Sequence, residues 1–229
     1  MANVAITGAG RGIGFELVKQ HLAAGDRVFA LVRNPSGAAA LGGLAASSAG
    51  QLTVHQLDVT DGQSVTSGAA SLGDAGIDIL YNVAGVADAP RSRLEEIDWT
   101  NFDEVIDVGL KGPLRVLIAF LPRLHSGSKV INLSSQIGAS TWPFGGGYYA
   151  YGATKAALNR LMQSVAIDLK DRGIIVGLVH PGWVQTDMGG PNADITPEES
   201  ARGIVAVTRN WTLDRSGDFY KWNGEPHAW

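Results

Sequence analysis

The sequence predicts an α/β protein built on one doubly wound parallel sheet, with helices on both faces. Short runs rich in β-branched and apolar residues recur along the whole chain, and amphipathic stretches separate them. The runs are apolar without interruption, as expected for strands that are covered on both sides. No linker or internal repeat is visible. Residues 1–229 are therefore expected to form a single domain.

The expected strands begin at the N-terminus and alternate with helices. The strand candidates are residues 3–7, 27–32, 52–57, 77–83, 129–134 and 174–180. The clearest helix candidates are residues 14–25, 101–124 and 151–173. Residues 36–50 are rich in small side chains and are expected to form a weak helix with loose ends. With 30 glycines in the chain, where an average usage of about 7% is typical, we expect many tight turns between strands and helices.

Composition excludes several classes of protein. The formal net charge of −4 leaves no basic surface for nucleic acid. The absence of cysteine excludes disulfides and thiolate chemistry and fits a reducing compartment. No apolar run reaches the roughly 20 residues of a membrane span, and the first ten residues lack the features of a secretory signal. A cytoplasmic location is expected, with neither nucleic acid nor membrane as a partner.

A glycine-rich turn follows the first expected strand. The segment TGAGRGIG contains Gly8, Gly12 and Gly14 and opens a helix. Glycines let the backbone approach a pyrophosphate, and a helix N-terminus supplies N–H donors and a favourable dipole. A plain glycine-rich turn is the alternative. The position between a strand and a helix favours a dinucleotide site.

Tyr151 and Lys155 form the most reactive pair in the sequence. They are four residues apart on an expected helix, so their side chains share a face. An ammonium beside a phenol favours the phenolate and is expected to lower the pKa of Tyr151, which is about 10 in a free side chain. Tyr151 is then able to act as a general acid or base. The neighbouring Tyr148 and Tyr149 are left for packing or for the mouth of a pocket.

Several motifs in order along the chain resemble the short-chain dehydrogenase/reductase family. These are the glycine turn, NVAG at 82–85, NLSSQIG at 132–138, the Tyr151/Lys155 pair and HPGWVQTDM at 180–188. The C-terminal segments further resemble its small carbonyl-reductase-like branch, which includes C-factor and sniffer-type proteins. The resemblance implies a Rossmann-like NAD(P)-binding domain that carries both the cofactor and the substrate site.

The resemblance also implies roles for individual residues. The expected catalytic residues are Ser135, Tyr151 and Lys155, while Ser134 is expected to satisfy backbone groups. The residues expected to contact the dinucleotide are Gly8, Arg11, Gly12, Ile13, Gly14, Arg33, Asp58, Val59, Asn82, Ala84, Gly85, Tyr151, Lys155, Pro181, Gly182, Val184 and Thr186. A cap on the following helix is the alternative role of Asp58.

The second expected strand ends without a carboxylate, which bears on the choice of cofactor. Arg33 follows this strand and Arg11 lies in the glycine turn. Guanidinium groups suit a 2′-phosphate, whereas a carboxylate there would bind a 2′-hydroxyl. We expect NADP(H) rather than NAD(H). Two solvated surface arginines are the alternative.

The substrate is expected to be an apolar or aryl ketone or aldehyde. Large apolar side chains that flank the expected catalytic residues predict an apolar pocket, although each aromatic taken alone is more typical of the core than of a ligand contact. These candidates are Trp142, Phe144, Tyr148, Trp183 and Met188. No cluster has the spacing of a metal site. The resemblance implies a homodimer or homotetramer.

Gly109 is a departure from the family, which usually has an asparagine there to hold a relay water. A more hydrated relay, slow turnover, cofactor binding without reduction, and close helix packing are all compatible with a glycine. The sequence thus predicts an NADPH-dependent carbonyl reductase or alcohol dehydrogenase. The alternative is an NADP-binding regulatory protein with little turnover.

Overall fold

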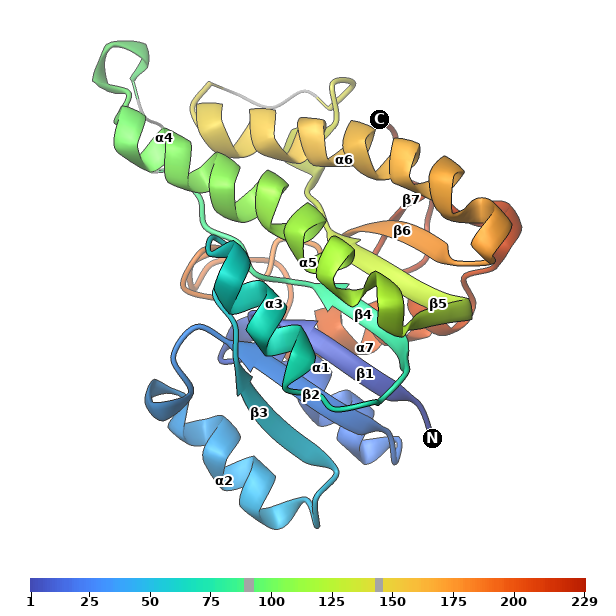
Figure 1. Ribbon diagram of the computed structural model, residues 1–229. Coiled ribbons are helices and arrows are strands. Elements are labelled where there is room, and N and C mark those ends of the chain that lie inside the picture. The colour runs from blue at the N-terminus through green and yellow to red at the C-terminus, as the bar shows by residue number, and fades with distance from the viewer. Residues whose placement is uncertain (89–92, 143–145) are drawn as a thin grey trace.

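Seven parallel strands form the sheet of the computed structural model, which describes residues 1–88, 93–142 and 146–229 (Figure 1). The strand order is β3-β2-β1-β4-β5-β6-β7. The strands are β1 (Asn3–Thr7), β2 (Arg27–Val32), β3 (Leu52–Gln56), β4 (Ile77–Asn82), β5 (Leu124–Leu133), β6 (Ile175–His180) and β7 (Phe219–Lys221). The predicted doubly wound parallel sheet is confirmed.

Helices cover both faces of this sheet, because each face presents a continuous apolar surface (Figure 1). One layer contains α3 (Gly62–Ala70), α5 (Gly112–Phe120) and α6 (Tyr149–Leu169), and α4 (Trp99–Ile106) continues it. The other contains α1 (Gly12–Ala23), α2 (Ala39–Ser47) and α7 (Pro197–Arg209). The two cores are therefore separated by the sheet, as in other Rossmann-like α/β folds.

The strand order reverses between β1 and β4, since β2 and β3 lie on one side of β1 and the later strands on the other. In open parallel sheets a ligand crevice forms at the carboxyl ends of the strands at this point. The glycine turn after β1 and the NVAG turn after β4 both lie there. The fold therefore places two of the predicted motifs next to each other.

Two elements differ from the sequence prediction. The expected helix 101–124 is divided into α4, a π-helical segment (Asp107–Lys111) and α5, and it ends in a 3₁₀ turn before β5. The short strand β7 was not predicted; it extends the sheet by pairing with β6. The first difference matters for the site, because π-helical segments commonly lie at functional positions.

Candidate active site

A cavity of about 1130 Å³ opens along the carboxyl ends of the strands. It collects side chains from the glycine turn, the ends of β2 and β3, the NVAG turn, α6 and the segment after β6. Of the residues singled out in the sequence, the cavity is lined by Gly8, Arg11, Gly12, Ile13, Gly14, Arg33, Asp58, Val59, Ala84, Gly85, Ser134, Tyr151, Lys155, Pro181, Thr186 and Met188. Ser135 is not one of the lining residues. Chain segments that are far apart in sequence thus share one wall.

The glycine turn is packed directly against the NVAG turn. Gly8 has a positive φ of 65°, and a Cβ added there would lie 2.8 Å from the backbone nitrogen of Ala84. A Cβ on Gly14 would meet the carbonyl oxygen of Gly8. The Thr7 hydroxyl ties the turns together by accepting hydrogen bonds from the backbone N–H groups of Val83 (3.0 Å) and Ala84 (3.3 Å). The glycine turn and the NVAG turn together form a narrow cradle for an anion. Side chains larger than glycine would fill it.

The N-terminus of α1 faces the same cavity and has no side-chain cap. An uncapped helix start with a glycine-lined approach suits the pyrophosphate of a dinucleotide. Arg11 and Arg33 supply cations at this end of the cavity. The geometry of this chain therefore fits the cofactor that the motifs predict.

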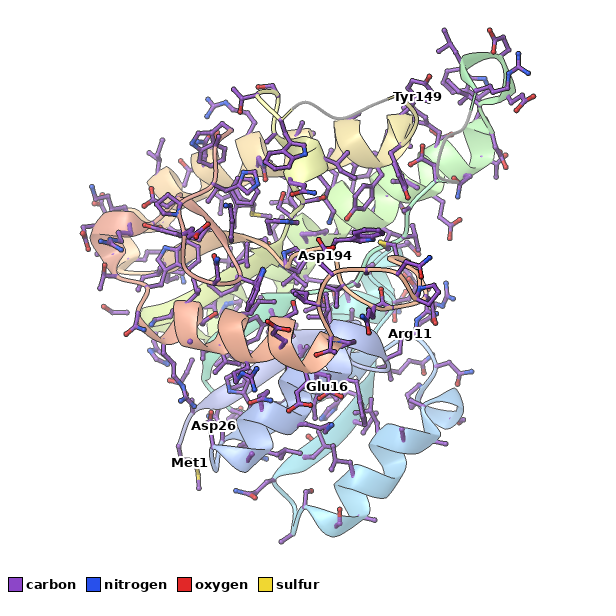
Figure 2. All side chains as sticks on the ribbon, turned by 180° about the vertical axis from the view of Figure 1, so that it is seen from behind. Met1, Arg11, Glu16, Asp26, Tyr149 and Asp194 are labelled. Atoms are coloured by element: carbon purple, nitrogen blue, oxygen red, sulfur yellow. The ribbon has the colours of Figure 1, made fainter. Side chains whose placement is uncertain are left out.

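Arg11 also reaches the segment that follows β6. The Arg11 guanidinium, labelled in Figure 2, forms an ion pair with Asp187. The two side chains are 78% and 76% exposed, respectively. This contact joins the glycine turn to the segment that follows β6. The sequence analysis missed it, because the partners are 176 positions apart.

Asp58 orders the turn after β3 rather than capping the next helix. Its Oδ1 accepts hydrogen bonds from the backbone N–H of Thr60 (3.0 Å) and from the Thr60 hydroxyl (2.8 Å). The cap of α3 is Asp61, which accepts from the backbone N–H of Gln63 at 2.9 Å. The capping alternative for Asp58 is wrong, and its carboxylate lies at the cavity wall.

Three predicted cofactor residues do not line the cavity. Asn82 is buried and donates to Asn132 Oδ1 at 2.9 Å, which ties β4 to β5. A Cβ on Gly182 would lie 2.5 Å from the Ile195 side chain, and Val184 forms a β-bridge with Ile195. In this structure these residues support the sheet and the segment after β6.

Tyr151 and Lys155 lie near the start of α6. Asp88 caps this start, because its carboxylate accepts the backbone N–H groups of Ala150 (3.2 Å) and of Tyr151 itself (3.0 Å). The Lys155 ammonium donates to the carbonyl oxygen of Leu133 at 2.8 Å and lies 5.5 Å from the centre of the Tyr151 ring. The tyrosine is thus anchored through its backbone, and the lysine through its ammonium.

Ser135 is held against Tyr151 by a tight 3₁₀ turn (Gln136–Gly138). Its hydroxyl oxygen accepts the backbone N–H of Ile137 at 3.2 Å, and the hydroxyl lies close enough to the Tyr151 phenol to oppose the rise in the pKa of that phenol. The turn packs closely on α6, since a Cβ on Gly138 would lie 2.7 Å from Lys155 backbone and side-chain atoms. The three predicted catalytic residues therefore lie together.

Ser134 is used differently from Ser135. It donates to the side chain of Asn159 at 2.6 Å in the core, and so the expectation that it satisfies backbone groups is wrong. Consecutive side chains along an extended backbone point to opposite sides. Ser134 and Ser135 therefore face in different directions, and only Ser135 is directed at Tyr151.

Burial controls the charge states of this cluster. It raises the pKa of Tyr151 to about 12, against the opposing effect of the Ser135 hydroxyl. It also lowers the pKa of Lys155 to about 8. The expected lowering of the Tyr151 pKa is wrong for the protein by itself, because the loss of water around the phenol has the largest effect on this pKa. The Lys155 ammonium donates to the Leu133 carbonyl oxygen instead. Tyr151 is therefore a neutral proton donor at neutral pH.

The predicted substrate residues are only partly gathered at the cavity. Met188 lines it, whereas Trp183 donates to the carbonyl oxygen of Gly189 at 2.8 Å. The Tyr148 ring lies 6.2 Å from that of Tyr151, and the Trp142 ring lies 5.8 Å from that of His227. The prediction for Phe144 falls outside the described residues.

Gly109 lies in the π-helical segment and packs against α6. A Cβ there would come within 2.7 Å of the Thr154 methyl group. Among the alternatives for this glycine, the structure supports close helix packing. Thr154 precedes Lys155, and so the contact fixes the distance between the π-helical segment and the part of α6 that carries the reactive pair.

The described ranges 1–88, 93–142 and 146–229 contain no helix long and apolar enough to cross a membrane. In the same ranges, no group of three or more His, Cys, Asp or Glu side chains is arranged to hold a metal ion.

Comparison with known proteins identifies the family. Residues 2–195 match the short chain dehydrogenase family. C-signal of Myxococcus xanthus is 37% identical over 155 residues, which are 67% of this chain and 93% of that protein. The NADPH-bound carbonyl reductase from chicken fatty liver superposes with a TM-score of 0.92 and 35% identity, over 100% of this chain and 99% of the other.

The carbonyl reductase Sniffer of D. melanogaster superposes with a TM-score of 0.94 and 29% identity, over 100% of both chains. These similarities extend over the cradle, the Ser135 turn and α6. The chain therefore belongs to the short-chain dehydrogenase family, and it is an oxidoreductase of the carbonyl reductase type.

Proposed function

We propose that this protein uses NADPH to reduce an apolar or aryl ketone or aldehyde to the alcohol, with both sites in one domain of residues 1–229. The observation that carries the proposal is the half-buried Tyr151, whose phenol lies beside the Ser135 hydroxyl and which lines the same cavity as the glycine turn. A proton donor, a polarising hydroxyl and an anion cradle are the parts that carbonyl reduction requires.

Each residue has a separate task in this reaction. The glycine turn, Arg11 and Arg33 would hold NADPH, and the bound cofactor would supply the hydride for the carbonyl carbon. Ser135 donates a hydrogen bond to the carbonyl oxygen, and Tyr151 gives its phenolic proton to that oxygen as negative charge develops. Lys155, held by the Leu133 carbonyl oxygen, stabilises the resulting phenolate by its charge and orients the nicotinamide end of the cofactor.

The choice of NADPH over NADH rests on the charges at the other end of the cavity. Arg11 and Arg33 line it, and β2 ends without a carboxylate. A 2′-phosphate gains from such guanidinium groups, whereas a 2′-hydroxyl does not. The solved relative from chicken carries NADPH, which is consistent with this choice.

The apolar substrate class rests on fewer contacts. Met188 lines the same cavity as Tyr151, and Trp183 lies on the same segment after β6. A site with one polar cluster and apolar walls favours uncharged ligands.

The test is NADPH consumption across a panel of aryl, alkyl and charged carbonyl compounds, with NADH in parallel. Turnover that is faster with NADPH and with uncharged aryl substrates is the expected result. Tight binding of NADPH without turnover of any carbonyl would instead support the regulatory alternative. Failure to bind either dinucleotide would contradict both.

A further inference from the structure

His180 is a buried group outside the three predicted catalytic residues. It is the last residue of β6 and is 7% exposed. Its Nδ1 lies 3.3 Å from the backbone nitrogen of Gln136, the residue that follows Ser135. An N–H donor requires an acceptor, and so Nδ1 carries no proton in this contact.

The surroundings of His180 keep the ring neutral. Burial lowers its pKa to about 4, and the nearby charges of His227 and Lys221 act in the same direction. The contact with Gln136 thus has an acceptor at every physiological pH. No carboxylate is needed to fix the ring.

The bonded amide lies within the turn that presents Ser135. Gln136 is the first residue of the 3₁₀ turn, and the next amide, that of Ile137, donates to the Ser135 hydroxyl oxygen. Two successive amides are therefore fixed, one by β6 and one by Ser135 itself. Removing the acceptor would leave the Gln136 N–H without a partner, which destabilises the turn in its present conformation.

Side chains near the C-terminus pack against the His180 ring. The His227 ring lies edge-on to His180 at 5.5 Å and stacks on Phe219 of β7 at 4.6 Å. The main-chain oxygen of Trp229 accepts the backbone N–H (3.1 Å) and the hydroxyl (2.6 Å) of Thr141. Both ends of the segment after Ser135 are therefore attached, one to β6 and the other to residues 227–229.

We propose that His180 is a positioning residue for Ser135: its Nδ1 holds the Gln136 amide and thereby keeps the Ser135 hydroxyl in reach of Tyr151 and of the substrate oxygen. The inference rests on the proposed function, because Ser135 matters only if a carbonyl oxygen is bound there. Misplacement of a reacting group by about 1 Å can cost 10²-fold in rate. The effect is therefore expected in kcat.

The variants His180→Asn and His180→Gln distinguish a hydrogen-bonding role of His180 from a packing role. Asparagine places Oδ1 where the histidine has Nδ1, so it can still accept from Gln136, whereas glutamine places its oxygen one bond farther out. His180→Asn is expected to keep kcat within about threefold, and His180→Gln to lower it by about 10- to 100-fold. Both lose the ring, and their melting temperatures should fall by similar amounts.

A second readout does not require activity. Amide hydrogen exchange of Gln136 in the cofactor-free protein should remain slow in His180→Asn and become fast in His180→Gln. The Kd for NADPH should stay unchanged in both. His227→Phe, which retains an aromatic ring on Phe219, should leave kcat near that of the wild type.

Equal kcat values for His180→Asn and His180→Gln would overturn the inference, as would equal protection of the Gln136 amide. A loss of kcat in His227→Phe as large as in His180→Gln would also overturn it. These results leave the proposed function intact as long as the wild type turns over. A wild type that binds NADPH but reduces no carbonyl removes the proposed function, and the exchange comparison still decides whether His180 holds the turn.

Discussion

The two ends of the cavity are built on opposite physical principles. At the glycine turn, Arg11 and Asp187 form an ion pair in water, with about three quarters of each side chain exposed. At the other end, Lys155 lines the cavity, and Lys155 and the two residues that support Tyr151 (Ser135 and His180) are each no more than 7% exposed. Charges in water are screened and contribute little, whereas buried groups shift their pKa values and depend on each contact. Substitutions should therefore have large effects at the Ser135 end and small ones at the Arg11 end.

The largest effect in this comparison is expected for Ser135→Ala. Loss of a hydrogen-bond donor to a developing oxyanion costs about 10²- to 10³-fold in kcat. The Kd for NADPH, measured by fluorescence, should not change. Ser134→Ala is the matched control, because this serine also lines the cavity but donates its hydrogen bond to the buried Asn159 side chain. A rate loss shared by both variants would show that stability, rather than the donor, is being measured.

The burial of His180 should also affect how the free energy of unfolding depends on pH. His180 has a pKa of about 4 in the folded protein and about 6.5 when unfolded. As the pH falls from 6.5 to 4, the unfolded state takes up this proton first, so the free energy of unfolding decreases. The full difference is about 3 kcal/mol.

Urea unfolding at pH 7 and near pH 4 measures this loss. In His180→Asn that part of the decrease should vanish, while the contributions of other titrating groups remain. An identical pH dependence in the variant and the wild type would contradict the assignment of a neutral, buried His180.

An intermediate loss of stability is expected from changes at the contact between the π-helical segment and α6. Gly109→Asn places a Cβ against the Thr154 methyl, and overpacking of this kind costs about 1–3 kcal/mol. Thr154→Ser, which removes that methyl, should recover much of the loss in the double variant. Thermal unfolding checks both. A stable Gly109→Asn protein with faster reduction would instead favour a relay limited by the missing amide.

The smallest effect is expected for Asp187→Asn at the exposed end. Releasing Arg11 from its partner should tighten NADPH binding by at most about fivefold, since exposed ion pairs contribute about 1 kcal/mol or less. The change should disappear in high salt and should not extend to NADH. Asp194→Asn, an exposed change of equal charge in the same segment (Figure 2), should have no effect. A change in the Kd for NADPH larger than tenfold in Asp187→Asn would contradict the expectation that substitutions at the exposed end have only small effects.

The features that could be predicted are those that depend on residues close together in the sequence. The buried apolar runs predicted six strands, and Tyr151 and Lys155 were paired by their helical spacing. Strand β7 was missed because three residues carry too weak a pattern, and its position depends on pairing with β6.

Contacts between distant segments were not predictable. The bonds from Asp88 to Tyr151 and from His180 to Gln136 join residues 63 and 44 positions apart. The pKa of Tyr151 was predicted to fall because spacing reveals a neighbouring charge, yet it rises because burial dominates. Burial of a single side chain depends on the whole fold.

The most direct test of the central claim, that Tyr151 donates the proton, is a single-turnover measurement with Tyr151→Phe. NADPH is bound first, its Kd is measured by fluorescence, and a ketone that the wild type reduces is then added. The account predicts an unchanged Kd and a reduction rate lowered by about 10²- to 10⁴-fold. A Tyr151→Phe protein that oxidises its bound NADPH at the wild-type rate would contradict it.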